Sequence, residues 1–179
     1  MQQAKAFLTT REAEETVHIG ELLGMFINRP LVVALDGDLG TGKTVFVRGA
    51  ARGLGVEGEQ VASPTFVLLK IYRGRLPVHH FDFYRLSEED DFYELGFEEY
   101  LPGEGAAFIE WAGRLPHLLP PEYLQVVLER MEDEQGEGRR IWFVPFGLEA
   151  SRVVESLFGA VTWRTNGSLH RQQPRDIML

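Results

Sequence analysis

The eight residues 37–44 constrain this chain more than any other feature. They read Gly-Asp-Leu-Gly-Thr-Gly-Lys-Thr and match the phosphate-binding loop pattern G-x-x-x-x-G-K-[ST]. The residues 31–35 before them form a short apolar run, which is typical of a strand buried in a parallel sheet. The residues from Thr44 onward read as a helix. This order brings backbone N–H groups and a helix N-terminus to one polyanion, so the motif predicts a nucleoside triphosphate site.

The predicted nucleotide-binding residues are Gly37, Asp38, Leu39, Gly40, Thr41, Gly42, Lys43 and Thr44. The glycines allow unusual backbone dihedral angles and a close approach of the phosphates. Lys43, one of only three lysines in the chain, is expected to reach the outer phosphates, and the Thr44 hydroxyl is expected to bind magnesium. The alternative, a flexible glycine-rich turn, does not account for the strand and helix on either side.

Composition limits the remaining possibilities. A chain of 179 residues, 44% hydrophobic, is expected to form one domain over residues 1–159 with a polar, flexible tail over residues 160–179. The absence of cysteine and of any apolar run near ~20 residues predicts a cytoplasmic protein without a membrane span. The net charge of −9 argues against a free-standing nucleic-acid binder, which needs Lys and Arg to neutralise phosphates.

The rest of the sequence predicts a three-layer α/β fold with a mostly parallel central sheet and added antiparallel hairpins. A capping box of Thr9 and Glu12 would open a helix over 11–28, in which Gly20 and Gly24 admit a neighbouring backbone. Further elements are expected as a hairpin of 66–72 and 76–84, a helix after Ser87, a strand over 106–110, a hairpin of 123–131 and 139–144, and a helix over 148–158.

Two acids are candidates for catalysis. In the second strand of the first hairpin, period-two alternation would put His80, Asp82 and Tyr84 on one face, unless this is merely a solvated edge strand. Glu110 ends an apolar run, as expected of a central strand that delivers a carboxylate to the ligand-binding edge of the sheet. Glu110 is the better candidate for magnesium, because the strand of Asp82 is too polar to lie centrally. A surface acid at a strand end is its alternative.

The segment Ser63-Pro64-Thr65 lies between the loop helix and the next strand, where a segment can contact the γ-phosphate or magnesium in one state and release it in another. Its two hydroxyls can bond phosphate oxygens or a water, and Pro64 limits its conformations. We therefore expect a nucleotide-sensing switch, with a plain turn as the alternative.

The phosphate loop, Ser-Pro-Thr, His-Phe-Asp-Phe-Tyr-Arg at 80–85 and Ile-Glu-Trp at 109–111, in this order, resemble the TsaE (YjeE) family. The resemblance covers roughly residues 9–140. It implies a small bacterial ATPase that works with two partner proteins, of the TsaD and TsaB type, in making threonylcarbamoyl adenosine in tRNAs that read ANN codons. Transfer RNA itself would be contacted only indirectly.

The same resemblance implies ATP and Mg²⁺ as ligands and assigns roles to single residues. Thr44 and Glu110 would bind the metal, Asp82 would lie in the active site, and Ser63-Pro64-Thr65 would be the switch segment. Arg139, which follows Gly138 in the late hairpin, would contact the adenine side.

Two other functions stay open at this point. A small-molecule kinase could use the same loop, but it would need an acceptor pocket and further arginines, and no Arg-rich lid is visible. A nucleotide-gated adaptor would bind ATP with little turnover. Because no motif supplies an arginine finger, we expect slow hydrolysis by this chain alone and dependence on a partner.

Overall fold

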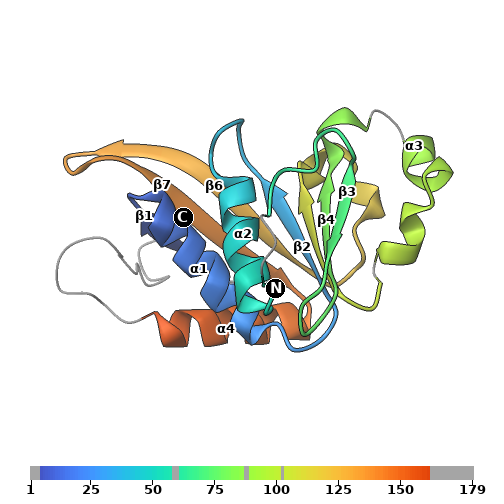
Figure 1. Cartoon of the computed structure of the whole chain (residues 1–179). Helices are drawn as coiled ribbons and strands as arrows, with labels where there is room; N and C mark the ends of the chain where they lie inside the picture. Colours follow the sequence, from blue (N-terminus) through green and yellow to red (C-terminus); the bar gives the residue numbers. More distant parts are fainter. Residues whose placement is uncertain (1–4, 58–60, 87–88, 102, 162–179) are drawn as a thin grey trace.

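The computed structural model describes residues 5–57, 61–86, 89–101 and 103–161, and its centre is a mixed β-sheet (Figure 1). In this part of the chain seven strands lie in the order β1-β7-β6-β2-β5-β4-β3. The four inner strands β6, β2, β5 and β4 are mutually parallel, while β7, β1 and β3 add antiparallel pairings outside them. The strands are β1 (Ala6–Thr10), β2 (Leu31–Asp36), β3 (Leu69–Tyr72), β4 (Val78–Asp82), β5 (Ala106–Glu110), β6 (Tyr123–Asp133) and β7 (Gly136–Phe146).

Helices cover both faces of the sheet, which confirms the predicted three-layer α/β fold. The helices α1 (Ala13–Phe26), α2 (Lys43–Gly53) and α4 (Leu148–Ala160) lie on one face (Figure 1). They bury one core together with Val33 and Leu35 of β2. The alternate residues Val32 and Ala34 join a second core on the other face. Shorter helices close it: η1 (Phe83–Arg85), α3 (Glu89–Glu94), η2 (Phe97–Tyr100), η3 (Ala112–Arg114) and η4 (Pro116–Leu118).

The helices α1 and α2 touch backbone to backbone, as the glycine spacing predicted. A Cβ added at Gly20 would lie 2.2 Å from the Phe46 carbonyl oxygen, and one at Gly24 would lie 2.1 Å from that of Ala50. Real Cβ atoms do not approach a carbonyl so closely, so these positions require glycine. The contact fixes α2, which follows the phosphate loop directly, against the rest of the fold.

The N-terminal boundary differs from the prediction. Helix α1 begins at Ala13, and its capping box joins Glu12 and Glu15. The predicted box of Thr9 and Glu12 is wrong, because Thr9 belongs to β1 and pairs with Arg140 of β7. Sequence reasoning missed β1 because an edge strand is defined by the partner strand it pairs with, here more than 120 residues away.

The first hairpin forms, but β4 is more central than predicted. It is hydrogen-bonded to β3 on one side and parallel to β5 on the other, and all five of its residues are buried. The interpretation that 78–81 are too polar for a central strand is therefore wrong. The predicted common face with Tyr84 is also wrong, since the strand ends at Asp82 and its carboxylate caps the turn η1 by accepting a hydrogen bond from the Tyr84 N–H.

The later elements follow the prediction closely. The strand over 106–110 is β5, the late hairpin is β6 and β7 with a shorter turn than expected, and the last helix is α4, which extends to Ala160. The expected cap at Ser87 and residues 162–179 of the expected tail lie outside the described residues. Within the described ranges, none of the helices is long and apolar enough to span a bilayer.

Candidate nucleotide and metal site

The phosphate loop joins β2 to α2, and its backbone has the geometry that its glycines allow. Gly37, Gly40 and Gly42 have φ angles of 135°, 77° and 105°. A Cβ at Gly37 would also lie 2.2 Å from the carbonyl oxygen of Leu128. Residues with a side chain rarely adopt such angles, so the loop depends on these glycines. The loop leads into the N-terminus of α2, where the first backbone N–H groups have no hydrogen-bond partner within the helix and can face a ligand.

Lys43, the first residue of α2, lies inside this turn. Its Nζ donates hydrogen bonds to the carbonyl oxygens of Gly37 and Asp38 at 2.6 and 2.9 Å. The same ammonium lies 3.9 Å from the centre of the Trp111 ring. Burial lowers the pKa of Lys43, while the nearby carboxylates of Glu110 and Asp82 act in the opposite direction. A cation is thus held at the loop among acidic groups and one aromatic ring.

The two predicted metal ligands are in contact. The Thr44 hydroxyl donates a hydrogen bond of 2.7 Å to Oε1 of Glu110. Glu110 reaches this place because β5 is parallel to β2, with Glu110 opposite Leu35, two residues before the loop begins. The same Oε1 lies 2.8 Å from Nε2 of His80. The Glu110 side chain is nearly buried, so these two contacts define its position.

This pair fits Mg²⁺ by its chemistry. A hydroxyl and a carboxylate are hard oxygen ligands, and Mg²⁺ is usually bound by one or two such groups together with substrate phosphates and waters. Among the described residues no group of three or more His, Asp or Glu side chains could hold a metal without such help. The arrangement therefore suits a metal that arrives with a phosphate chain rather than one held by a protein cage.

Asp82 joins the Ser63-Pro64-Thr65 segment to the sheet. In the parallel register Asp82 stands opposite Glu110, so the two acids end neighbouring strands. Its Oδ2 accepts hydrogen bonds from Ser63 Oγ at 3.3 Å and from Thr65 Oγ1, and its Oδ1 accepts one from the Tyr84 N–H at 2.9 Å. The segment predicted to be a switch is thus bonded directly to a candidate catalytic acid.

One pocket, which we call the phosphate pocket, brings these groups together. It has a volume of about 330 Å³ and opens beside the phosphate loop. Its lining residues are Leu39, Gly40, Gly42, Lys43, Thr44, Val45, Ser63, Thr65, Asp82, Glu110 and Trp111. Most of the predicted site therefore meets in one place, while Leu39 at the tip of the loop remains 78% exposed.

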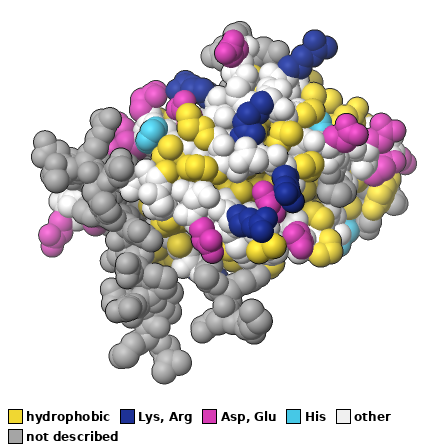
Figure 2. Space-filling model, turned by 90° about the horizontal axis from the view of Figure 1, so that it is seen from below, with side chains coloured by type: hydrophobic (Ala, Val, Ile, Leu, Met, Phe, Trp, Pro, Cys, Tyr) yellow, Lys and Arg dark blue, Asp and Glu magenta, His cyan; other side chains and the backbone are white. Residues whose placement is uncertain are grey.

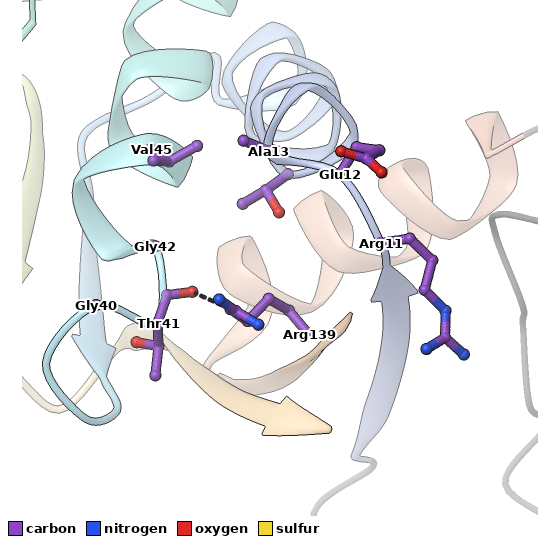
Figure 3. A pocket seen from close by; sticks show the side chains of 9 residues that line it. Arg11, Glu12, Ala13, Gly40, Thr41, Gly42, Val45 and Arg139 are labelled. Atoms are coloured by element: carbon purple, nitrogen blue, oxygen red, sulfur yellow. Dashed lines mark hydrogen bonds between the residues drawn. The ribbon is translucent and has the colours of Figure 1, made fainter. Parts of the chain in front are cut away.

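Arg139 lies at a second pocket on the other side of the loop. Figure 3 shows Arg139 reaching toward Thr41, and its Nε donates a hydrogen bond of 3.2 Å to the Thr41 carbonyl oxygen. Arg11 lines the far side of this pocket. Gly40 and Gly42 line both pockets, so the two spaces adjoin along the phosphate loop. Arg139 is accordingly near the loop but does not line the pocket of Lys43 and Glu110.

Sequence reasoning missed three residues of this region. The ring of Trp111 covers Lys43, the imidazole of His80 contacts Glu110, and Arg11 lines the second pocket. The sequence did contain a signal for Trp111 and His80, because both lie within motifs already singled out: Trp111 follows Glu110, and His80 precedes Asp82 by two positions. Nothing in the sequence around Arg11 indicated its place.

Comparison with known proteins gives one consistent result. The family model described as "Threonylcarbamoyl adenosine biosynthesis protein TsaE" matches residues 10–141. The tRNA threonylcarbamoyladenosine biosynthesis protein TsaE of Bacillus subtilis is 40% identical over 149 residues, covering 83% of this chain and 90% of the relative. That of Treponema pallidum is 40% identical over 128 residues, covering 72% and 94%.

A solved structure agrees with the sequence relatives. The crystal structure of Bacillus subtilis YdiB superimposes with a TM-score of 0.75 at 35% identity, covering 89% of this chain and 97% of that one. Every residue of the two pockets falls within the segment matched by the family model.

Proposed function

This chain belongs to the TsaE family, and we propose that it binds MgATP at the phosphate loop and hydrolyses it, slowly alone and faster with partner proteins. TsaE proteins take part in tRNA threonylcarbamoyladenosine biosynthesis. The hydrolysis proposed here would support threonylcarbamoylation of adenosine in tRNAs that read ANN codons, in the cytoplasm, with partners of the TsaD and TsaB type.

The observation that carries the proposal is the convergence of Lys43, Thr44, Asp82 and Glu110 on one pocket at the N-terminus of α2. Lys43 and the loop N–H groups would bind the phosphates, because a helix N-terminus with a cation favours a polyanion. Thr44 and Glu110 would hold Mg²⁺, which neutralises charge on the phosphates when bound. Asp82, which stands opposite Glu110 in the register, would orient an attacking water.

The second pocket suits the nucleoside part of the ligand. It adjoins the phosphate loop at Gly40 and Gly42 and carries the guanidinium of Arg139. A guanidinium can stack on an aromatic base or donate to its acceptor atoms. This supports an adenine-side role for Arg139, with Arg11 on the opposite wall.

The side chains that line the phosphate pocket support the proposed dependence on partners. Lys43 is the only cationic side chain among the described lining residues, and no arginine is present there. An arginine supplied by another protein can accelerate phosphoryl transfer by about a thousandfold or more. The same lack of arginines speaks against a small-molecule kinase, which needs them for a transferred phosphate.

Indirect contact with tRNA is supported by the charge of the surface. On the face shown in Figure 2, the Lys and Arg side chains lie among acidic and hydrophobic ones rather than in one continuous basic area. With a net charge of −9, the chain offers little to neutralise an RNA backbone. A partner that binds the tRNA is therefore part of the proposal.

Turnover of labelled ATP tests this function and the switch together. We expect slow hydrolysis by the wild type alone and a marked increase with the two partner proteins. The variant Ser63→Ala, Thr65→Ala should lose most of the increase, because its loop can no longer bond Asp82 or a phosphate. Ser151→Ala, which removes a hydroxyl from α4 far along the chain, is the matched control.

Two results would contradict the proposal. The first is a wild type that turns over ATP as fast alone as with partners. The second is a double variant that responds to the partners normally, which would return the segment to a plain turn. Transfer of the label to an added small-molecule acceptor would instead favour the kinase, and tight ATP binding without turnover under any condition would favour the adaptor.

A further inference from the structure

We infer that His80 is a positioning residue for Glu110: its imidazole fixes the carboxylate in the orientation in which Glu110 and Thr44 can hold a divalent cation. The inference rests on the proposed MgATP site. It adds to that site a residue of β4 that is not among the residues lining the phosphate pocket and that acts through Glu110.

The position of His80 leaves its ring little freedom. The side chain is fully buried, at 0% exposure, in a strand that is hydrogen-bonded on both sides. In the parallel register His80 stands opposite Phe108, two residues before Glu110, so the ring reaches forward to Glu110 on the same face of the sheet. Its Nε2 lies 2.8 Å from Oε1 of Glu110.

The hydrogen bonds determine how the Glu110 carboxylate is turned. A carboxylate only accepts hydrogen bonds, so Nε2 of His80 is the donor. The Thr44 hydroxyl donates to the same oxygen at 2.7 Å. Both hydrogen bonds found among the described residues fall on Oε1, which leaves Oε2 as the oxygen available to a ligand. Without His80 the Glu110 carboxylate would keep only its hydrogen bond from Thr44. Because Thr44 is itself a proposed metal ligand, that hydrogen bond alone would not fix the carboxylate when the metal binds.

The His80 ring has two nitrogens, and only Nε2 has a hydrogen-bond partner among the described residues. Within the described part of the chain, Nδ1 is buried and has no hydrogen-bond partner. The one polar interaction that the ring makes is therefore the one with Glu110, and partners of this kind commonly orient metal ligands.

His79 provides a comparison within the same strand. It is also buried with an unpaired Nδ1, but it lies on the other face of the sheet, where its ring packs edge-on against Tyr100 at 5.1 Å between ring centres. His79 lines neither pocket. A change at His79 thus reports the cost of altering a buried histidine of β4 without touching the metal site.

The experiment measures ATP binding by calorimetry in EDTA and at increasing Mg²⁺ concentrations. His80→Gln keeps an N–H near the position of Nε2, whereas His80→Asn is polar but too short to reach Glu110. We expect equal ATP affinity in EDTA for all proteins. The Mg²⁺ concentration needed for half of the metal-dependent gain in affinity should rise by about 10- to 100-fold in His80→Asn, stay close to wild type in His80→Gln, and be unchanged in His79→Asn.

Each outcome decides the inference. If His80→Asn needs no more Mg²⁺ than wild type, or if His80→Gln fails as badly as His80→Asn, positioning through Nε2 is wrong. A His80 variant that loses ATP binding in EDTA as well, or melts far below His79→Asn, would show a role in the fold instead. If wild-type ATP binding does not respond to Mg²⁺ at all, the proposed metal site itself fails and the inference fails with it.

Discussion

Replacing Lys43 with methionine should remove most of the affinity for ATP while leaving the fold intact. Methionine has nearly the same length and can rest against the Trp111 ring, but it has no charge and no N–H to donate. In the structure the Lys43 ammonium donates two hydrogen bonds to carbonyl oxygens of the loop. When ATP binds, phosphate oxygens would replace these carbonyl oxygens as acceptors. The substitution therefore removes the one cation that lines the phosphate pocket in the described residues.

The size of the loss follows from those two hydrogen bonds. A hydrogen bond to a charged group contributes about 1.5–3 kcal/mol, and a factor of ten in affinity corresponds to about 1.4 kcal/mol. Two such bonds to phosphate oxygens correspond to roughly 3–6 kcal/mol. The wild type must first break its bonds to Gly37 and Asp38, which offsets part of this gain. We therefore expect ATP affinity to fall by on the order of a hundredfold, or about 3 kcal/mol.

The fold should tolerate the change, although Lys43 itself is only 4% exposed. The carbonyl oxygens that it leaves belong to Gly37 and Asp38, which are half-buried and exposed, so water can reach them. Calorimetric titration with ATP and thermal unfolding check both expectations. Lys70→Met in β3 is the matched control and should bind ATP as wild type does. An unchanged ATP affinity in a folded Lys43→Met protein would refute the assignment of the phosphate site.

Two further substitutions test the metal site and the scaffold. Glu110→Gln should reduce magnesium-dependent turnover more than ATP binding, because the Glu110 carboxylate would act mainly on charge that develops in the transition state. Glu155→Gln is the control. Equal losses of turnover and binding in Glu110→Gln, or no loss in either, would contradict this. Gly24→Ala should destabilise the protein by about 1–3 kcal/mol in denaturant unfolding, since the new methyl group would lie 2.1 Å from the Ala50 oxygen. Gly159→Ala in α4 is the control: its added methyl group would have no atom within 4 Å, so it should be neutral or slightly stabilising. Equal effects of the two substitutions on the free energy of unfolding would disprove the close contact at Gly24.

The features that sequence reasoning identified are those set by local chemistry. The phosphate loop needs glycine at three positive φ angles and a lysine at the helix start, and these requirements are visible in eight consecutive residues. The apolar runs of β2 and β5 show their burial on both faces. The spacing of Gly20 and Gly24 likewise revealed the contact with α2 before the neighbouring helix was known.

The features that it missed depend on partners distant in sequence. The strand β4 reads as an edge strand by composition, yet His80 is buried because Glu110, 30 residues later, accepts its hydrogen bond. Thr9 has the pattern of a helix cap, but pairing with β7 extends it into β1. No local pattern contains either partner. The central position of β4 is nevertheless what brings Asp82 beside Glu110.

That adjacency gives a route by which the Ser63-Pro64-Thr65 segment and the proposed metal site would influence each other. Asp82 and Glu110 end two neighbouring inner strands, so their backbones are fixed, and what can change is which hydroxyl groups bond their carboxylates. Thr44 is bonded to Glu110, and Ser63 and Thr65 are bonded to Asp82. A phosphate or metal that draws these hydroxyls away from the acids would change the loop surface that a partner meets. Coupling of affinities is reciprocal, so a partner that prefers the rearranged loop must tighten ATP binding by the same factor that ATP tightens the partner.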